Sequence, residues 1–463
     1  MSVPSHTEPY DSVLGTIGWT PLIRLARVGA GIRTPVYGKA EFANPGGSVK
    51  DRIGLAIIEA AEQDGSLAPG GTVVEGTSGN TGVGLAIAAA LKGYHCIFTM
   101  PDKMSQEKVR LLRAYGAEVV ITPTAVPPDH PENYVMKAKQ IVKETPGAVL
   151  ANQFFNDVNP EAHYQTTGPE IWRQTSGKVT HFVAAAGTGG TVSGVGKYLK
   201  EQRADIRIIA CDPVGSLYTE FARTGEMGEG EPYKVEGVGG DKIPTTVWFD
   251  YIDEFRQLSD RDSFIMARRI AGEEGMLVGG STGMNVHVAL DIAKKLDDPE
   301  ACVVTVLTDT GERYLSKQFN DDWMRENQYL DIPRVTVAQL LERRSEDAPP
   351  LVSVAPAAAV RQALNLMKTW EVSQLPVVED GRCIGSLVEG SLMIQSLEEP
   401  TLLDRPVRDV MDDPLPVVDY NYPSDRLAPM LTRESPAALV ERDGDLIGIV
   451  SRYDLLQQLI GGR

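Results

Sequence analysis

Hydrophobic residues recur along the first two thirds of the chain in short runs that alternate with longer amphipathic stretches. The short runs are rich in β-branched residues and lie at Val36–Glu41, Thr72–Val74, His95–Thr99, Glu118–Ile121, His181–Ala185, Ile206–Ala210 and Cys302–Leu307. The amphipathic stretches include Ile53–Asp64, Gly82–Leu91, Gln106–Tyr115 and Val192–Lys200. Strands that alternate with helices predict an open α/β architecture with parallel sheets, in which ligands bind in loops at the carboxyl ends of strands.

The pattern changes after a linker near Gln328–Arg334. The remaining chain contains an approximate repeat with a period of about 60 residues, with copies at Ser373–Met393 and Ser435–Leu456. Each copy has two strand-like runs joined by an Asp-Gly turn, and then a helix-like run. Because each copy buries only half a core, we expect the two copies to pack on each other.

Length supports this division, since 463 residues are too many for one ordinary core. The expected domains are residues 1–327, 335–396 and 402–463.

Charge and composition exclude several classes of partner. The chain has 45 Lys and Arg against 63 Asp and Glu, a net charge of −18. Such a surface repels nucleic-acid phosphates and anionic lipid, so neither nucleic acid nor a membrane is an expected partner, although simple solubility also explains the charge. The longest apolar stretch, Gly82–Leu91, is about half as long as a membrane span.

The four cysteines are far apart and form no CxxC pair, which indicates reduced thiols in a cytoplasmic protein and predicts no metal site. The segment Met1–Tyr10 is polar, so no secretory signal is expected.

The first chemical motif is Asn44-Pro45-Gly46-Gly47-Ser48-Val49-Lys50-Asp51-Arg52. Pro and Gly end a strand, Ser48 can cap the next helix, and Lys50 then falls in its first turn. The positive end of the helix dipole favours a neutral amine there, which is the form that Schiff-base chemistry requires. An isolated lysine would instead be read as a solvated surface residue.

Three further motifs are rich in glycine and small hydroxyl residues, and the first two of them follow strand-like runs. They are Glu75-Gly76-Thr77-Ser78-Gly79-Asn80-Thr81-Gly82, Gly187-Thr188-Gly189-Gly190-Thr191 and Gly279-Gly280-Ser281-Thr282-Gly283. Small hydroxyl residues and N–H groups at a helix start can hold a carboxylate, and a glycine turn can approach a phosphate. A neutral Ser281 facing a pyridine nitrogen would leave that nitrogen largely unprotonated, which disfavours transamination. Each motif alone also fits an ordinary structural turn.

In their order and spacing, the four motifs closely resemble the fold-type II pyridoxal-phosphate enzymes, over about residues 10–325. The resemblance implies a tryptophan-synthase-β-like fold of two open α/β subdomains. It implies that Lys50 carries pyridoxal 5′-phosphate as a Schiff base and that Asn80 binds its 3′-oxygen. Gly187, Thr188, Gly189, Gly190 and Thr191 would cradle the phosphate, and Ser281 would meet the pyridine nitrogen. The substrate carboxylate would be held by Thr77, Ser78, Asn80, Thr81 and Gln153.

Within this family, the loop Glu236-Gly237-Val238-Gly239-Gly240-Asp241 is similar to the acidic loop of cystathionine β-synthases, whereas cysteine synthases have an uncharged version. Glu236 and Gly237 would then bind substrate, since an acidic loop suits a thiol that carries an ammonium group. Ser316–Met324 also resembles the end of that catalytic core. Phe154 and Gly240 depart from eukaryotic members, which have tyrosines there. No Cys/His pair precedes the core, so haem is not expected.

The C-terminal repeat resembles a tandem pair of CBS domains. Gly448–Asp454 matches the element whose hydroxyl and carboxylate bind the ribose of an adenosyl ligand, here Ser451 and Asp454. The first copy has Val388 and Ser391 at those places and has lost both contacts. The resemblance therefore implies one adenosyl site, built from Ser451, Asp454 and the segment Val372, Ser373 and Gln374, for S-adenosylmethionine or an adenine nucleotide. A structural or dimerising module without a ligand is the alternative.

The resemblance implies β-replacement, in which L-serine and L-homocysteine condense to cystathionine in transsulfuration. It leaves open a cysteine synthase that uses O-acetylserine or O-phosphoserine with sulfide. An adenosyl-ligand sensor with a vestigial catalytic core is a third interpretation. Family members imply a homodimer or homotetramer.

Overall fold

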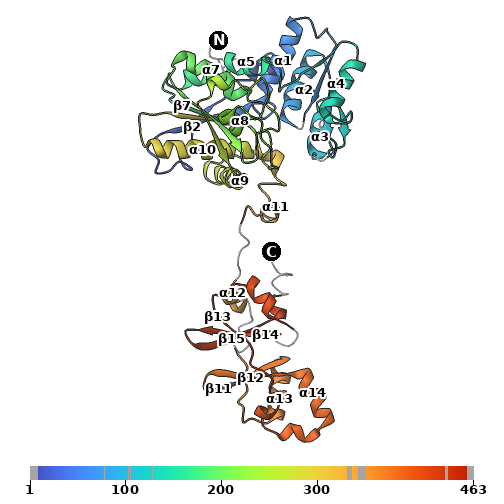
Figure 1. The fold of residues 1–463 in the computed structure, drawn as a ribbon, viewed down its shortest axis with the longest axis vertical. Coiled ribbons are helices and arrows are strands. Elements are labelled where there is room, and N and C mark those ends of the chain that lie inside the picture. The colour runs from blue at the N-terminus through green and yellow to red at the C-terminus, as the bar shows by residue number, and fades with distance from the viewer. Residues whose placement is uncertain are drawn as a thin grey trace. The chain divides into compact units, whose positions relative to one another are not determined.

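The computed structural model describes residues 9–77, 79–102, 104, 106–127, 129–330, 336–342, 351–432 and 436–455. The chain forms two compact units, Met1–Leu330 and Asp331–Arg463, which Figure 1 shows coloured from blue to red. Each unit has hydrophobic clusters of its own, three in the first and three in the second among the described residues. The predicted linker residues 331–334 lie outside the described residues.

A four-stranded sheet forms one half of the first unit. Its strand order is β5-β4-β3-β6, and all of its pairs are parallel. Its strands are β3 (Thr72–Gly76), β4 (His95–Pro101), β5 (Glu118–Thr122) and β6 (Ala148–Leu150). The helices beside it are α1 (Lys50–Gln63), α2 (Asn80–Lys92), α3 (Gln106–Ala114) and α4 (Tyr134–Glu144). Residues such as Ile53, Val83 and Phe98 form the core between these elements.

A six-stranded sheet forms the other half, with the order β1-β2-β10-β7-β8-β9. All of its pairs are parallel except that of β1 with β2. Its strands are β1 (Leu22–Arg24), β2 (Val36–Ala40), β7 (His181–Ala185), β8 (Arg207–Pro213), β9 (Glu254–Leu258) and β10 (Val303–Leu307). The helices of this half are α5 (Val158–Gln165), α6 (Thr167–Gln174), α7 (Gly190–Gln202), α8 (Tyr218–Thr224), α9 (Asp260–Arg269), α10 (Gly280–Leu296) and α11 (Asp321–Glu326).

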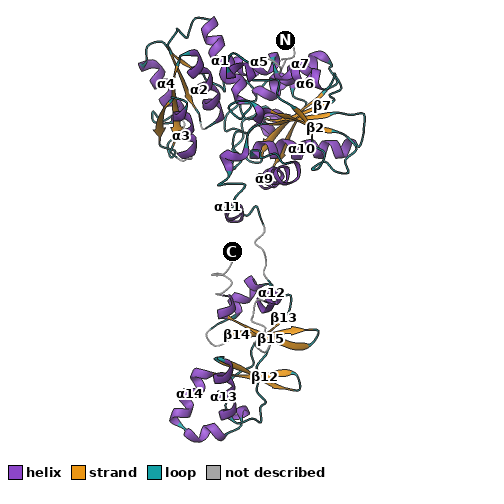
Figure 2. Cartoon of the chain, turned by 180° about the vertical axis from the view of Figure 1, so that it is seen from behind, coloured by secondary structure: helices purple, strands orange, loops and turns teal. Residues whose placement is uncertain are grey.

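Both faces of the six-stranded sheet are covered, as Figure 2 shows. Alternate residues of β10 point to opposite faces: Val303 and Leu307 join the cluster under α9 and α10, and Val304 joins the cluster under α6 and α7. Parallel pairing also brings the carboxyl ends of the strands in each sheet to one edge, where ligand loops are expected. The predicted α/β fold with two open subdomains is therefore confirmed.

The second unit contains two hairpins, β11 (Gln374–Glu379) with β12 (Arg382–Val388) and β14 (Ala437–Arg442) with β15 (Asp445–Ser451). Asp380 and Gly381 have φ values of 49° and 77°, and Asp443 and Gly444 have 55° and 91°. Two positive φ angles in succession are what a two-residue hairpin turn requires, which confirms the predicted Asp-Gly turns. The other α-helices and the other strand of the described residues in this unit are α12 (Val337–Glu342), α13 (Val360–Trp370), α14 (Glu389–Glu398), β13 (Val417–Asp419) and α15 (Ser424–Leu427).

The two copies of the repeat pack on each other through a small apolar cluster. Cys383 of the first copy packs against Leu415, Ala437 and Leu439. This contact confirms the expected packing. Ser435 and Leu456, which bound the predicted second copy, lie outside the described residues.

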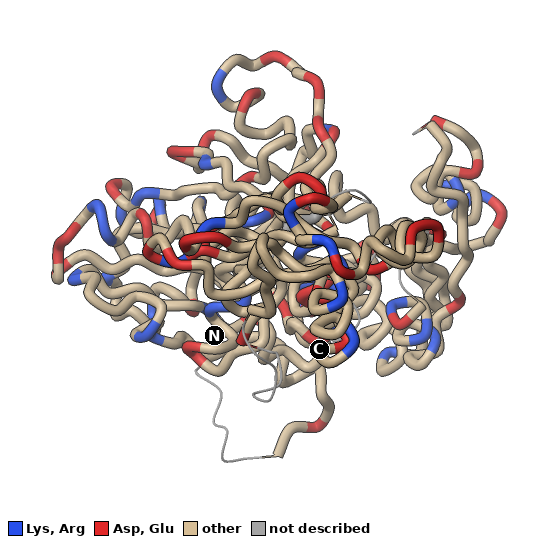
Figure 3. The backbone as a smooth tube through the Cα atoms, turned by 90° about the horizontal axis from the view of Figure 1, so that it is seen from below, with Lys and Arg blue, Asp and Glu red and all other residues tan. Residues whose placement is uncertain are grey.

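Acidic positions are interspersed with basic ones along the described chain (Figure 3). None of the described helices has the length and apolarity needed to cross a bilayer. Within the same residues, no group of three or more His, Cys, Asp and Glu is arranged to hold a metal ion.

Candidate active site

Lys50 is the first residue of α1, as the sequence predicts. Its backbone N–H donates to Ser48 Oγ at 3.2 Å, although the capping residue itself is Val49. Desolvation of the amine by burial lowers the pKa of Lys50 to about 8, against an opposing effect of Asp309. The helix dipole was the cause expected from the sequence, whereas desolvation is the largest cause in the structure. The neutral amine is therefore more accessible near neutral pH than in an ordinary lysine.

Glycines bring α2 directly against the first turn of α1. A Cβ atom on Gly84 would lie 2.5 Å from the Lys50 carbonyl oxygen, and one on Gly54 would collide with the Gly84 backbone. Without side chains at these two positions, the helices approach closely enough for the start of α2 to lie beside the Lys50 segment.

Ser281 lies in the first turn of α10 and is buried. Its hydroxyl shares a 2.7 Å hydrogen bond with Thr308 Oγ1, and Thr282 shares one of 2.9 Å with the same atom. The Thr308 carbonyl oxygen accepts the Val49 N–H at 2.9 Å. Thr308 therefore joins the serine motif to the lysine motif.

Asn80 begins α2, and its side chain is held on both sides. Its Nδ2 donates to Asp309 Oδ2 at 2.8 Å, and Arg313 donates to its Oδ1. Arg313 also donates to the Gly46 carbonyl oxygen, and the Tyr314 hydroxyl donates to Asp309 Oδ2 at 2.7 Å.

The segment from Thr308 to Tyr314, directly after β10, thus contacts three of the four predicted motifs. Sequence reasoning did not select it. The available signal was a polar stretch that follows a largely apolar strand, which the structure shows to be fully buried, at the ligand-binding edge of the sheet.

The glycine loop is packed so tightly that side chains would not fit. A Cβ atom on Gly187 would collide with the Gly237 carbonyl oxygen, one on Gly189 with Val247, and one on Gly190 with Asn159. Because α7 begins at Gly190, the first N–H groups of this helix have no partner within it and can face an anion at the loop.

Two buried side chains that the sequence did not reveal support the threonines of this loop. Asn159 Nδ2 donates to Thr188 Oγ1 at 2.9 Å and to the Gln153 carbonyl oxygen at 2.8 Å. His163 Nε2 lies 3.2 Å from Thr191 Oγ1. Burial first, and then the charges of Arg52 and Lys50, lower the pKa of His163 to about 3, so the ring is neutral.

Of the residues expected to hold the substrate carboxylate, Thr77 follows β3, Asn80 and Thr81 begin α2, and Gln153 follows β6. Thr81 Oγ1 donates to Gln153 Oε1 at 2.6 Å, and the Thr77 hydroxyl accepts the Gly79 N–H at 3.3 Å. Glu75 accepts the backbone N–H groups of Asn152 and Gln153 at 2.7 and 3.4 Å. Ser78 lies outside the described residues.

Glu236 is paired within its own chain. Lys108 of α3 and Lys317 both donate to its carboxylate. Burial alone would raise the pKa of Glu236, but the two ammonium groups outweigh burial and lower it. Any other ammonium group would have to compete with these lysines.

Gly237 lies against the glycine loop, and Gly240 lies against Tyr218. The Tyr218 hydroxyl donates to the Gly187 carbonyl oxygen at 2.7 Å, and a Cβ atom on Gly240 would collide with that hydroxyl. Tyr218 therefore fills the space beside Gly240. Gly240 is the position at which eukaryotic members of the family have a tyrosine.

A buried network of charged side chains holds the start of α1 in place. Arg52 pairs with Glu41 and Glu170, each at 2.7 Å, and Lys39 pairs with Glu170 at 2.6 Å. Burial alone would raise the pKa of Glu41, but Arg52 lowers it to about 2. Two positive and two negative groups thus balance in the interior.

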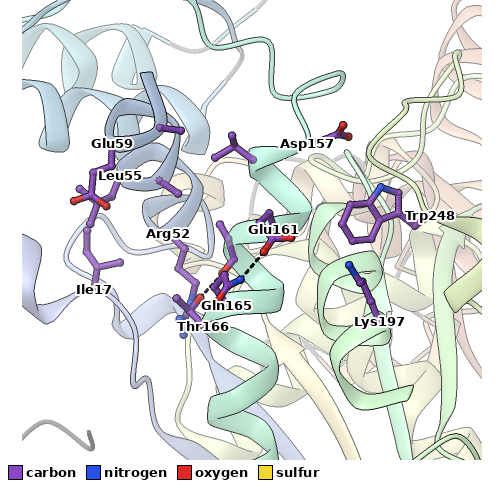
Figure 4. Close-up of a pocket in the computed structure, with 14 residues that line it drawn as sticks. Ile17, Arg52, Leu55, Glu59, Asp157, Glu161, Gln165, Thr166, Lys197 and Trp248 are labelled. Atoms are coloured by element: carbon purple, nitrogen blue, oxygen red, sulfur yellow. Dashed lines mark hydrogen bonds between the residues drawn. The ribbon is translucent and has the colours of Figure 1, made fainter. Parts of the chain in front are cut away.

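Arg52 also lines a cavity of about 720 Å³ between α1, α5 and α7. Figure 4 shows Leu55 on one side, Trp248 on the other, and Gln165 donating to Glu161 at 2.5 Å between them. None of the predicted site residues lines this cavity.

In the second unit, Ser451 ends β15 and bonds to Asp454. The Ser451 N–H and hydroxyl both donate to Asp454 Oδ2 at 2.7 Å. Val372, Ser373 and Gln374 lead into β11, where the Ser373 carbonyl oxygen accepts the Glu389 N–H.

The donor set of the first unit fits pyridoxal phosphate. A desolvated amine suits an aldehyde, and a buried serine hydroxyl suits a pyridine nitrogen. A glycine loop that ends at a helix start and carries two threonine hydroxyls suits a phosphate. Lys50, Gly187–Thr191 and Ser281 are the residues that would hold these three groups.

Comparison with known families agrees with this chemistry. The family described as pyridoxal-phosphate dependent enzyme matches residues 13–309, and the CBS domain family matches residues 346–396 and 407–461. The solved structure of an O-acetylserine dependent cystathionine β-synthase from Helicobacter pylori is 36% identical, with a TM-score of 0.62, and the match covers 67% of this chain and 98% of that one.

Curated relatives match one or both units. A cystathionine β-synthase from Dictyostelium discoideum is 37% identical over 464 residues, covering 97% of this chain and 92% of the relative. A cysteine synthase from Staphylococcus aureus (strain Mu50) is 46% identical over 310 residues, covering 67% of this chain and 96% of the relative. The chain belongs to the fold-type II pyridoxal-phosphate dependent enzymes, as a lyase of the cystathionine β-synthase family with a C-terminal pair of CBS domains.

Proposed function

We propose that the protein condenses L-serine with L-homocysteine to cystathionine, with pyridoxal phosphate carried on Lys50. The observation that carries the proposal is the desolvated Lys50 amine at the start of α1, with its pKa near 8. Similarity to a cystathionine β-synthase over both units supports the choice of substrates.

Lys50 acts as the general base and acid. Its Nζ takes the proton from the α-carbon of serine and later returns a proton to the α-carbon of the product. Between these transfers the serine Cβ–O bond breaks and the homocysteine sulfur forms a Cβ–S bond. The oxygen leaves as water, which takes up the proton that the homocysteine thiol gives up. When bound, pyridoxal phosphate supplies the electron sink for this chemistry.

The remaining residues bind and orient. Thr77, Ser78, Asn80, Thr81 and Gln153 hold the serine carboxylate. Thr188, Thr191 and the N–H groups of Gly187–Gly190 bind the cofactor phosphate, Asn80 binds the 3′-oxygen, and Ser281 contacts the pyridine nitrogen without protonating it. Glu236, beside Gly237, attracts the homocysteine ammonium group in competition with Lys108 and Lys317.

The Lys50→Ala variant tests the covalent role. After borohydride reduction, intact-mass measurement should show one added cofactor on the unchanged protein and none on Lys50→Ala. Lys317→Met, which removes a different amine of the same unit, should still gain the cofactor. Attachment at any lysine other than Lys50 would refute the assignment.

A cysteine synthase is the second candidate, favoured by the 46% identity to such an enzyme over the first unit. Mass spectrometry of the products decides between them. We expect cystathionine from serine and homocysteine at a higher kcat/KM than cysteine from O-acetylserine, or O-phosphoserine, and sulfide. The reverse order would make the protein a cysteine synthase.

We also propose that the CBS pair binds an adenosyl ligand, S-adenosylmethionine or an adenine nucleotide, at Ser451, Asp454 and Val372–Gln374. The bond between Ser451 and Asp454 supports this site because it holds the carboxylate at the end of β15, where a ribose would lie. Calorimetry should detect one of these ligands with the unchanged protein and not with Asp454→Ala. Absence of binding to the unchanged protein would leave a purely structural module.

A further inference from the structure

The turn after β10 forms hydrogen bonds with both the nitrogen and the oxygen of the Asn80 side-chain amide. Asp309 Oδ2 accepts from Asn80 Nδ2 at 2.8 Å, while Arg313 donates to Asn80 Oδ1. The two ends of an amide differ, since its nitrogen only donates and its oxygen only accepts. A carboxylate on one side and a guanidinium on the other therefore allow one orientation of this side chain.

Asp309 is itself held rigidly. It is 2% exposed, its Oδ2 also accepts the Tyr314 hydroxyl at 2.7 Å, and its backbone forms a β-bridge with Ser48. Among the described residues, its other oxygen, Oδ1, is buried without a hydrogen-bond partner. Oδ1 lies 2.2 Å from the position that a Cβ atom on Gly279 would take, so the carboxylate is packed directly against this glycine. Leaving a buried acceptor unsatisfied is costly, which indicates that the site is arranged around the bonds to Oδ2.

We propose that Asp309 is a positioning residue for the reaction, which fixes the Asn80 amide with its second N–H directed at the cofactor oxygen. The inference rests on the proposed role of Asn80. An amide nitrogen has two hydrogens, and Asp309 takes one of them, so the other remains for the cofactor. Arg313 completes the clamp by holding the amide oxygen on the opposite side.

Cofactor affinity tests this role without any amino-acid substrate. The cofactor-free protein is titrated with pyridoxal phosphate and binding is followed by fluorescence. Asp309→Leu keeps the volume but removes the acceptor, and its dissociation constant should rise about 10- to 100-fold, as loss of a hydrogen bond to a charged group implies. Asp309→Asn keeps an oxygen at the position of Oδ2 and should restore affinity close to that of the unchanged protein.

A double variant shows whether Asp309 acts through Asn80. In the Asn80→Ala background, Asp309→Leu should cause no further loss, because the amide that it positions is gone. Asp212→Leu removes an equally buried carboxylate that bonds to Thr219, and its effect should be the same in both backgrounds. If Asp309→Leu does not fold, Arg313→Met, at a partly exposed residue, is measured in the same two backgrounds with the same expectation.

Three results would overturn the inference: unchanged affinity in Asp309→Leu, no rescue by Asp309→Asn, or an equal loss with and without Asn80. Normal affinity in Asn80→Ala alone would instead refute the proposed role of Asn80. Because no serine or homocysteine is present, an error in the proposed substrates would leave all of these measurements unchanged.

Discussion

Buried carboxyl groups surround the start of α1 and the end of β3. Burial raises the pKa of Asp51 to about 7, that of Glu75 to about 7, and that of Asp309 above its ordinary value. Each of these groups accepts hydrogen bonds from the backbone or from a neighbouring side chain, so each one has a positional role. The cost of ionising them in the interior makes the stability of this unit depend on pH.

Glu75 gives a testable pH dependence. Its pKa is 4.5 in an unfolded chain and about 7 in the folded protein, so the unfolded state releases this proton first as pH rises. The free energy of unfolding therefore falls between pH 4.5 and 7, on the order of 3 kcal/mol for this group. Glu75→Gln should remove this pH-dependent contribution to the free energy of unfolding. In urea unfolding, the free energy of unfolding of Glu75→Gln minus that of the unchanged protein should therefore be more positive at pH 8 than at pH 5. An equal difference at both pH values would contradict the assignment.

Glu236 and its two lysines make a second prediction about single residues. Glu236→Gln should raise the KM for homocysteine about 10-fold and leave the KM for serine unchanged, because one charged contact is lost. Lys317→Met should lower the KM for homocysteine, since it removes a competing ammonium group. Steady-state kinetics with each substrate varied in turn measures both. A rise in both KM values for Glu236→Gln would mean that the carboxylate supports the fold instead.

At the scale of elements, the site depends on how closely α1 and α2 approach. The contact involves the backbone of Lys50 itself, so a shift of α2 moves Asn80 and Thr81 relative to the amine. The buried pairs of Arg52 with Glu41 and Glu170 hold the same helix start from the opposite side. The first turn of α1 is thereby constrained on two sides by close packing and by charge.

Gly84→Ala tests this constraint. Its Cβ atom would lie 2.5 Å from the Lys50 carbonyl oxygen, and we expect about 1–3 kcal/mol of destabilisation together with weaker cofactor binding. Gly272→Ala is the control, because a Cβ atom there has no neighbour within 4 Å. Chemical denaturation and cofactor titration measure the two effects. Gly84→Ala with the stability of Gly272→Ala would show that the helices can separate without cost.

At the scale of the whole molecule, the chain consists of two units with separate cores and separate predicted ligands. The proposed cofactor residues lie in the first unit, and the proposed adenosyl residues lie in the second. Ligand binding stabilises the folded form of the unit that binds it.

Thermal unfolding should therefore show two transitions that respond to different ligands. Removal of pyridoxal phosphate should lower the transition of the first unit. S-adenosylmethionine at 100 times its dissociation constant should stabilise the second by about 2.7 kcal/mol. Asp454→Ala should abolish the second effect and leave the first unchanged. Calorimetric scans with each ligand measure this, and one transition that moves with both ligands would contradict independent unfolding.

The sequence by itself determined the α/β architecture of the first unit and pointed to its candidate cofactor site. Periodicity predicted the principal strands and helices, because it depends on local backbone preferences. The order and spacing of the four motifs predicted the cofactor site through their resemblance to a known family. The Asp-Gly turns were predictable because positive φ angles favour particular residues.

Only the tertiary structure decided which distant side chains meet these motifs. Asp309 and Arg313 follow β10 at the edge where parallel strands end, and the fold decides which motifs they contact there. Asn159 and His163 lie on α5 and reach the glycine loop because α5 packs against α7. The pairing of Glu236 with two lysines and the desolvation of the Lys50 amine likewise arise from the surrounding fold. Burial and long-range contact depend on the positions of all these segments at once, so no single stretch of sequence contains them.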